Sequence, residues 1–118
     1  MKNSKLMTIV ELPLFLKRVA SVLDEAEKEA LINYLAANPE KGDEIPRTGG
    51  LRKLRWAAKD KGKRGGARVI YYFYNESAPV FLLSIYRKGV QENLRSEEEK
   101  KLTRLVALLK EACRIKRG

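Results

Sequence analysis

Residues 51–72, LRKLRWAAKDKGKRGGARVIYY, concentrate the side chains of this chain that could act on a phosphate. They include eight Lys or Arg residues and a single acid, Asp60. The pattern predicts a strand, a glycine-rich basic loop and a second strand. Because residues i and i+2 of a strand share a face, Lys53 and Arg55 should point the same way, and the loop should return Arg68 beside them. The cations would then surround a phosphate site, unless they are simply a solvated basic hairpin.

Lysine and arginine can support one well-defined reaction on RNA. An RNA strand is cut when its own 2′-OH attacks the adjacent phosphate, which requires in-line alignment, stabilisation of charge on the phosphate, and proton transfers. Guanidinium groups offer planar donor forks to phosphate oxygens, and a lysine crowded by other cations loses its proton more readily. Holding the substrate in alignment would supply much of the rate. Such a site needs no metal, and the sequence predicts neither a metal nor another cofactor.

The composition narrows the possible functions. The chain has 118 residues, a formal net charge of +10 and no histidine. Without histidine, the His-dependent catalytic triads, the paired-histidine ribonuclease mechanism and nearly all zinc chemistry are excluded. The charge indicates a polyanionic or acidic partner. No apolar run approaches the length of a membrane span and no signal peptide is recognised, so we expect a cytoplasmic protein without a membrane partner.

Periodicity and end signals predict the elements that would position the basic residues. A first strand is expected at residues 6–11, and Pro13 stands where a short helix would begin. Asp24 followed by Glu27 has the form of a capping box and predicts a second helix. That helix should end before Pro39, because a residue that precedes proline avoids the helical region.

The second half of the chain predicts a meander and a closing helix. Strand-like runs cover residues 51–57, 67–74 and 80–87, and their short links favour antiparallel pairing. Residues 41–50 are predicted as loop, and Ser96 followed by Glu99 predicts the start of the last helix. The order β-α-α-β-β-β-α describes a single α+β domain over residues 1–118. We expect a small, mostly antiparallel sheet with the helices packed on one face and the other face left available.

The segments LRKLR, GKRGGARVIYYF and FLLSIYRK, followed by a closing helix, resemble the RelE/ParE superfamily of bacterial type II toxins. The resemblance is strongest to the HigB-like branch and covers nearly the whole chain. It implies a RelE-like fold and a ribosome-dependent endoribonuclease, an mRNA interferase that cleaves mRNA in the ribosomal A site and so inhibits translation. ParE relatives share the fold, act on DNA gyrase and lack this basic site, so the cluster favours the ribonuclease.

The resemblance also implies which residues would do this work. The ribonucleases of the family use basic residues on the first strand after the helices, an arginine opening the next strand, and a basic residue after the last strand. In this chain these residues are Lys53, Arg55, Arg68 and Lys88, with Lys53 as the candidate proton acceptor. This chain has Leu94 where many relatives carry a tyrosine, and Lys88 where they carry arginine. The identities of the general acid and base therefore stay open.

Further residues are predicted to bind RNA without taking part in the reaction. They lie on or beside the basic strands and are Arg52, Lys59, Lys61, Lys63, Arg64, Tyr72 and Arg87. The four that belong to the glycine-rich loop would form an electrostatic arm for ribosomal RNA. Tyr72 shares strand parity with Arg68, so its ring could stack on a base.

The partners implied are a cognate antitoxin, HigA-like and partly acidic, together with the ribosome and its mRNA. Operator DNA would be contacted only indirectly, through the antitoxin. Two alternatives stay open. One is a non-catalytic nucleic-acid-binding module that uses the same basic face. The other is a protein of toxin fold that has another target, or that is inactive and acts through its antitoxin partner. Cleavage of mRNA on translating ribosomes would distinguish the first hypothesis from both alternatives.

Overall fold

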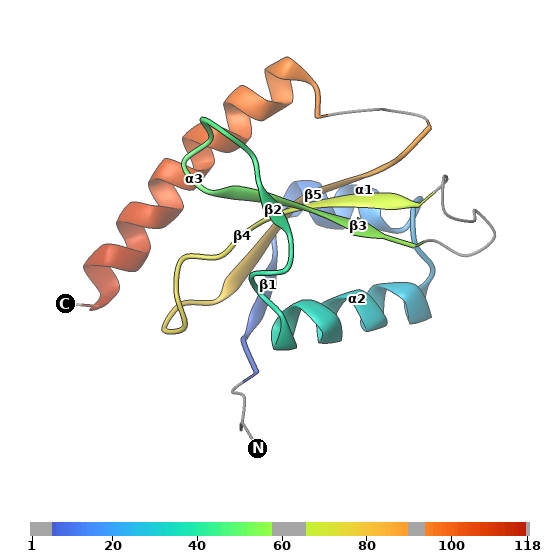
Figure 1. Cartoon of the computed structure of the whole chain (residues 1–118), viewed down its shortest axis with the longest axis horizontal. Helices are drawn as coiled ribbons and strands as arrows, with labels where there is room; N and C mark the ends of the chain where they lie inside the picture. Colours follow the sequence, from blue (N-terminus) through green and yellow to red (C-terminus); the bar gives the residue numbers. More distant parts are fainter. Residues whose placement is uncertain (1–5, 58–65, 90–93, 118) are drawn as a thin grey trace.

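The computed structural model describes residues 6–57, 66–89 and 94–117, which form three helices and five strands (Figure 1). The helices are α1 (Pro13–Val19), α2 (Glu25–Ala37) and α3 (Ser96–Arg117). The strands are β1 (Ile9–Glu11), β2 (Asp43–Glu44), β3 (Leu51–Trp56), β4 (Ala67–Tyr72) and β5 (Val80–Arg87). The predicted α+β order is confirmed, with β2 as an additional short strand inside the segment predicted as loop.

The strands form one sheet in the order β1-β5-β4-β3-β2. β3, β4 and β5 pair as the predicted antiparallel meander, and β2 pairs antiparallel to β3. β1 pairs parallel to β5 at the other edge. The sheet is therefore mostly antiparallel, as the sequence predicted, and β4 lies at its centre with both neighbours hydrogen-bonded to it.

The first two helices begin at the predicted signals. Pro13 occupies the first turn of α1, where its missing N–H removes no helical hydrogen bond. At the start of α2, the Asp24 side chain accepts from the Glu27 amide at 2.7 Å, and the Glu27 side chain accepts from the Asp24 amide at 2.8 Å. This capping box satisfies two amides that the helix leaves without partners. It confirms the predicted start of α2.

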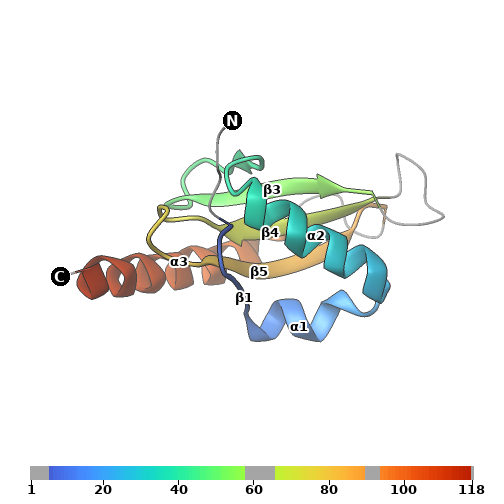
Figure 2. The ribbon, with the colours of Figure 1, turned by 90° about the horizontal axis from the view of Figure 1, so that it is seen from below.

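The sheet has an apolar core on each face, which corrects the expectation that all helices pack on one face. The core under α1 and α2 includes Phe15, Leu31, Leu35, Val69 and Tyr71, whereas the core under α3 includes Ile70, Tyr72, Leu83, Leu102 and Val106. Figures 1 and 2 show the sheet between α2 and α3. All six residues of β4 are buried, so consecutive apolar side chains point to opposite faces and both faces need a cover.

α3 covers only part of its face of the sheet. Leu51 of β3 and Ile70 of β4 are fully buried in the core beneath the helix. Lys53 lies on the same face directly opposite Ile70, and Arg55 and Arg68 follow towards the other end of the strands. Figure 2 shows α3 along one end of the strands and the other ends of β3 and β4 extending beyond it. The fold thus leaves the basic end of this face uncovered.

Candidate functional site

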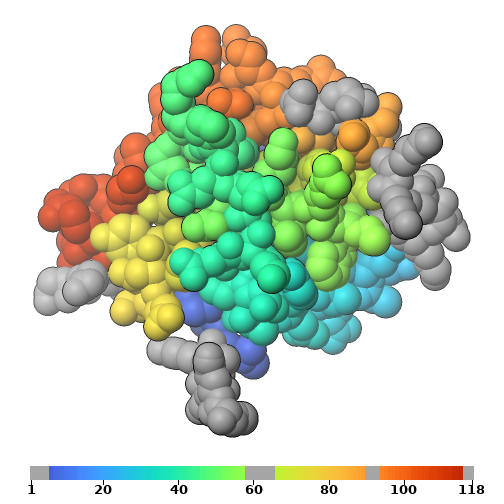
Figure 3. Space-filling model, in the orientation of Figure 1, coloured from blue at the N-terminus to red at the C-terminus, as the bar shows by residue number. Residues whose placement is uncertain are grey.

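The four predicted catalytic residues meet at the uncovered end of the sheet. A depression of about 520 Å³ is lined by Lys41, Asp43, Lys53, Leu54, Arg55, Arg68 and Lys88, and we call it the basic depression. Its lining comes from β2 and the segment before it, from β3 and β4, and from the residues that follow β5. Five of these seven residues carry a positive charge at neutral pH. In Figure 3 the light-green atoms of β3 lie at the surface, next to the green segment that contains β2.

The register of β3 and β4 brings two arginines directly opposite each other. Arg55 pairs with Arg68 across the strands, so both side chains lie on the same face. Arg55 is exposed, whereas Arg68 is only 8% exposed and donates to the carbonyl of Ala67 at 3.3 Å. Neither arginine forms an ion pair with any residue in the described ranges. Like charges placed opposite each other destabilise a sheet, so this arrangement suits an anionic ligand better than it suits the folded chain alone.

Lys88 is held beside the start of β4 by the backbone. Its amide donates to the carbonyl of Gly66 at 2.9 Å, which continues the β4–β5 ladder one step past Arg87. A Cβ atom on Gly66 would lie 2.8 Å from the carbonyl oxygen of Trp56, so β3 and β4 approach here only because residue 66 is glycine. Two hydrogen-bonded strands therefore bring Lys88 to cations that precede it by 20 residues or more in the sequence.

Lys41 and Asp43 belong to the basic depression and were missed by the sequence reasoning. Asp43 pairs with Lys53 across β2 and β3, so its side chain is on the same face as the predicted catalytic residues. β2 contains only two residues, and its pairing with β3 is not local in sequence. Composition suggested a loop here, and no periodic signal could have identified so short a strand.

A buried tyrosine from the other face anchors the segment before β2. The Tyr71 hydroxyl donates to the carbonyl of Pro39 at 2.9 Å and accepts from the amide of Gly42 at 2.8 Å. Burial raises the pKa of Tyr71, which keeps the hydroxyl in its donating form. A Cβ atom on Gly42 would lie 2.8 Å from the ring atom Cε1 of Tyr71, so the close approach requires glycine. This contact fixes the backbone that carries Lys41 and Asp43.

A sequence model of the family described as "RelE toxin of RelE / RelB toxin-antitoxin system" matches residues 44–116. The chain belongs to the RelE toxin family. The free-state structure of a mutant of the Escherichia coli toxin RelE is similar in fold, with a TM-score of 0.58 and 18% identity. The match covers 83% of this chain and 99% of that one. This RelE-family chain is therefore a toxin of a type II toxin–antitoxin system, the RelE-like fold is confirmed, and family membership implies an antitoxin partner.

Arg52 of the toxin, predicted to bind RNA, lies on the opposite face of β3 from Lys53. Its guanidinium donates to the carbonyl of Gly42 at 2.8 Å and to that of Glu40 at 3.1 Å. It also pairs with the Glu44 carboxylate at 3.4 Å. The structure does not bring Arg52 into the basic depression, and its contacts hold the segment that leads into β2.

Arg87 also lies apart from the basic depression. Its Nη2 donates to the carbonyl of Ser21 at 2.9 Å. Together with Arg18 and Arg95 it lines a separate depression of about 560 Å³ between the end of α1 and the start of α3. The same depression contains Glu98, so the arginines there have an acid beside them.

Tyr72 is wrongly predicted as a base-stacking residue. It is only 2% exposed and packs with Leu102 and Val106 in the core under α3. Burial raises the pKa of Tyr72 to about 12. The parity with Arg68 is as predicted, but α3 covers this end of the face and excludes a base from the ring. Leu94 is half-buried against the same core.

The remaining RNA-binding predictions concern the basic loop. Lys59, Lys61, Lys63 and Arg64 lie outside the described residues, and their role stays a prediction. Within the described ranges, no helix combines the length and the hydropathy needed to cross a membrane.

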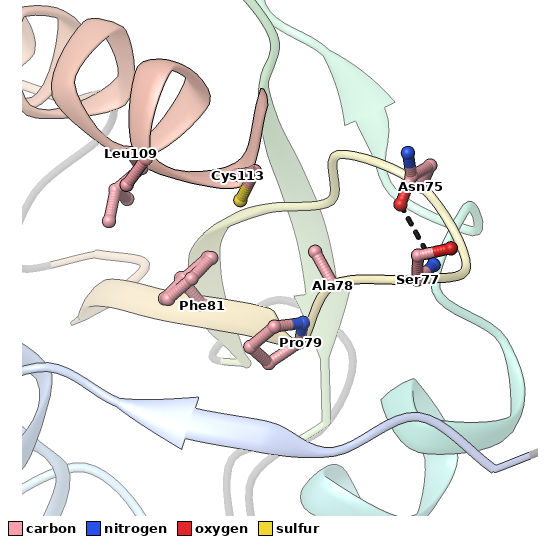
Figure 4. A pocket seen from close by; sticks show the side chains of 8 residues that line it. Asn75, Ser77, Ala78, Pro79, Phe81, Leu109 and Cys113 are labelled. Carbon is pink, nitrogen blue, oxygen red and sulfur yellow. Dashed lines mark hydrogen bonds between the residues drawn. The ribbon is translucent and has the colours of Figure 1, made fainter. Parts of the chain in front are cut away.

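A larger groove lies away from the charged residues (Figure 4). It has a volume of about 710 Å³ and runs between the turn after β4 and the C-terminal half of α3. Pro79, Phe81, Leu109 and Cys113 line it, and the Asn75 side chain accepts from the Ser77 amide at 2.8 Å on its rim. None of its lining residues was predicted to be catalytic or RNA-binding.

Proposed function

We propose that this toxin is an endoribonuclease that cleaves mRNA at the ribosomal A site. In the proposed reaction, the 2′-OH of one nucleotide attacks the adjacent phosphate. The working groups are Lys53, Arg55, Arg68 and Lys88. The observation that supports this proposal is their convergence on one depression from three separate parts of the sheet. Within the described residues, none of Lys53, Arg55 and Arg68 forms an ion pair.

Each cation has a task that suits its position. Arg68 is mostly buried, so packing restricts its guanidinium and presents it to the phosphate at little further entropic cost. Arg55, opposite it, can bind a second phosphate oxygen, and both stabilise the charge that grows in the transition state. The ammonium groups of Lys53 and Lys88 are donors and can supply a proton to the departing 5′ oxygen.

The ribosome would supply what the basic depression lacks. In-line attack requires the 2′ oxygen, the phosphorus and the leaving oxygen to lie nearly on one line, and RNA rarely holds this geometry alone. The basic depression offers charge from long side chains but little apolar surface on which a base could stack. An mRNA codon held on the ribosome would be presented to these cations already constrained.

The deciding experiment is primer extension on an mRNA translated in a purified system, with and without the toxin. We expect new 5′ ends within A-site codons, and none with naked mRNA. An mRNA carrying a 2′-deoxy nucleotide at the cleavage position should resist cleavage, because the attacking group is missing. A folded Lys53/Arg55/Arg68 triple alanine variant should produce no new ends. Cleavage of the deoxy substrate, or by the triple variant, would contradict the proposed mechanism.

The same assay tests the alternative of a binding module without catalysis. A module of this kind would bind ribosomes or RNA with an affinity that falls as salt rises, and would leave the mRNA intact. We infer that the toxin acts in the cytoplasm, where translating ribosomes are found. We also infer that the antitoxin is partly acidic and covers the basic depression or its rim, and that any contact with operator DNA passes through the antitoxin.

A further inference from the structure

Among the described residues that line the basic depression, one is an acid. Asp43 is exposed on β2 and lines the depression together with five cations, Lys41, Lys53, Arg55, Arg68 and Lys88. Arginine and lysine, in their charged forms, have only donors, whereas a carboxylate has only acceptors. Among the described residues that line the depression, Asp43 is thus the one side chain able to accept a proton without first losing one.

We propose that Asp43 is the proton acceptor for the 2′-OH, an assignment that rests on the proposed endoribonuclease function. Lys53, the acceptor suggested by the sequence, would first have to give up its own proton in order to take another. Asp43 needs no such step, because its carboxylate already has free lone pairs at neutral pH. This assignment leaves the neighbouring ammonium groups in the charged form that serves as a proton donor.

The strand register places the carboxylate beside the reacting groups. Asp43 pairs with Lys53 across β2 and β3, and side chains directly opposite each other have Cβ atoms about 4.5–5.5 Å apart. Asp43 forms no ion pair or side-chain hydrogen bond with any described residue, so its oxygens are available. The next residue, Glu44, faces the other way and pairs with Arg52 at 3.4 Å. Two adjacent acids of one strand therefore have different surroundings.

Three contacts fix the backbone at Gly42 and Asp43, as is needed for a group that must be positioned for proton transfer. Tyr71 contacts the Gly42 amide, and Arg52 donates to the Gly42 carbonyl at 2.8 Å. The pairing with Lys53 fixes Asp43 itself. A short edge strand would otherwise be a poor support, because catalytic groups must be held to within a fraction of an ångström.

The proposed reaction uses Asp43 as the proton acceptor and a lysine as the proton donor. The 2′-OH proton passes to a carboxylate oxygen of Asp43. An electron pair of the 2′ oxygen of the RNA forms the new bond to phosphorus. The bond from phosphorus to the 5′ oxygen breaks, and that oxygen takes a proton from the ammonium of Lys53 or Lys88. The products are a 2′,3′-cyclic phosphate and a 5′-hydroxyl. The proton on Asp43 then returns to the neutral lysine through water, which restores the site.

The test compares Asp43→Asn with Glu44→Gln, a matched pair that removes one negative charge from neighbouring positions of β2. Cleavage of ribosome-bound mRNA and binding to the same ribosomes are measured separately under single-turnover conditions. Asp43→Asn should slow cleavage by roughly 10²–10⁴-fold, the usual contribution of a general base. Binding should be unchanged or tighter, since a negative charge is removed from a surface that contacts a polyanion. Glu44→Gln should leave the cleavage rate within about threefold, because an exposed ion pair contributes little.

Asp43→Glu provides a second variant that keeps a carboxylate, and it should cleave faster than Asp43→Asn but more slowly than the wild type, because the longer side chain displaces the carboxylate. Cleavage by Asp43→Asn at the wild-type rate would overturn the assignment while leaving the proposed function intact. A loss of cleavage that merely follows a loss of ribosome binding would also overturn it, because the role would then be in binding. Intact mRNA with the wild-type toxin is a different result, because it would contradict the proposed endoribonuclease function itself.

Discussion

The toxin holds arginines against its sheet in two regions, and they differ in what the guanidinium groups contact. In the basic depression, Arg55 and Arg68 face each other and form no ion pair with a described residue. On the other side of β5, Arg18 donates to the Ser84 hydroxyl at 3.0 Å and to the Glu98 carboxylate at 2.9 Å. The Ser84 hydroxyl also donates to Glu98, at 2.8 Å. We call Arg18, Ser84 and Glu98 the arginine network.

The difference is between arginines that are paired within the fold and arginines that the proposed function assigns to a phosphate. The arginine network joins α1, β5 and α3, and its members satisfy one another where Ser84 is fully buried. In the basic depression, by contrast, Arg68 is mostly buried and forms no ion pair with a described residue, an arrangement that costs stability. Under the proposed function, a phosphate of the RNA would supply a negative charge to these guanidinium groups. Residue type alone does not distinguish the two regions, whereas the contacts do.

Among variants of the two arginine regions, the largest effect should come from Arg68→Ala in the basic depression. Loss of one positioned donor should slow cleavage of ribosome-bound mRNA by about 10²–10³-fold. The free energy of unfolding should change by at most about 1 kcal/mol, because lost packing of the side-chain stem and relief of the repulsion with Arg55 oppose each other. Arg104→Ala, which removes an exposed charge from α3, is the control. An Arg68→Ala variant that is unstable yet cleaves normally would place Arg68 with the folding arginines.

Glu98→Ala should produce the reverse pattern. Without Glu98, Arg18 and the buried Ser84 hydroxyl lose an acceptor, and the free energy of unfolding should fall by about 1–3 kcal/mol. The folded variant should cleave mRNA within about threefold of the wild-type rate, because Glu98 does not line the basic depression. Urea denaturation measures the first quantity. Glu97→Ala removes a neighbouring exposed acid from the same helix start and controls for the helix dipole. Equal destabilisation by both variants would argue against the network.

The smallest effect is expected for Arg87→Ala, which tests a residue that the sequence assigned to RNA. The hydrogen bond to the Ser21 carbonyl should contribute about 0.5–1.5 kcal/mol to stability. The slope of log affinity for ribosomes against log salt should not change. Arg55→Ala, by contrast, should reduce that slope by about one, as expected for a lost phosphate contact. A reduced slope for Arg87→Ala would return Arg87 to the RNA-binding residues.

Local signals in the sequence predicted the elements of this toxin well. Pro13 and the Asp24–Glu27 capping box mark the starts of α1 and α2, because the physics of a helix end involves only a few neighbouring residues. Strand parity placed Lys53, Arg55 and Arg68 on one face, since alternation along a strand is a property of the backbone. The family resemblance added Lys88, which local patterns could not connect with the others.

Long-range pairing produced the differences between expectation and structure. Tyr72 is on the predicted face of β4, but that part of the face lies under α3. No local sequence pattern predicts which end of a sheet face a distant helix will cover. β2 exists because two residues of a loop-like segment pair with β3. That pairing also decides that Asp43 faces the cations while Glu44 faces Arg52.

By itself, the sequence determined that this chain is a basic α+β toxin with a cationic β-hairpin and no histidine chemistry. Those features depend on composition, on the alternation of side chains along a strand, and on residues close together in the chain. Only the tertiary structure decided that α3 lies on the face opposite α1 and α2, that Arg18 pairs with Glu98 while Arg68 forms no ion pair with a described residue, and that an acid stands among the cations. Each of these depends on contacts between distant segments, where packing of the apolar faces fixes the neighbours that each charge will have.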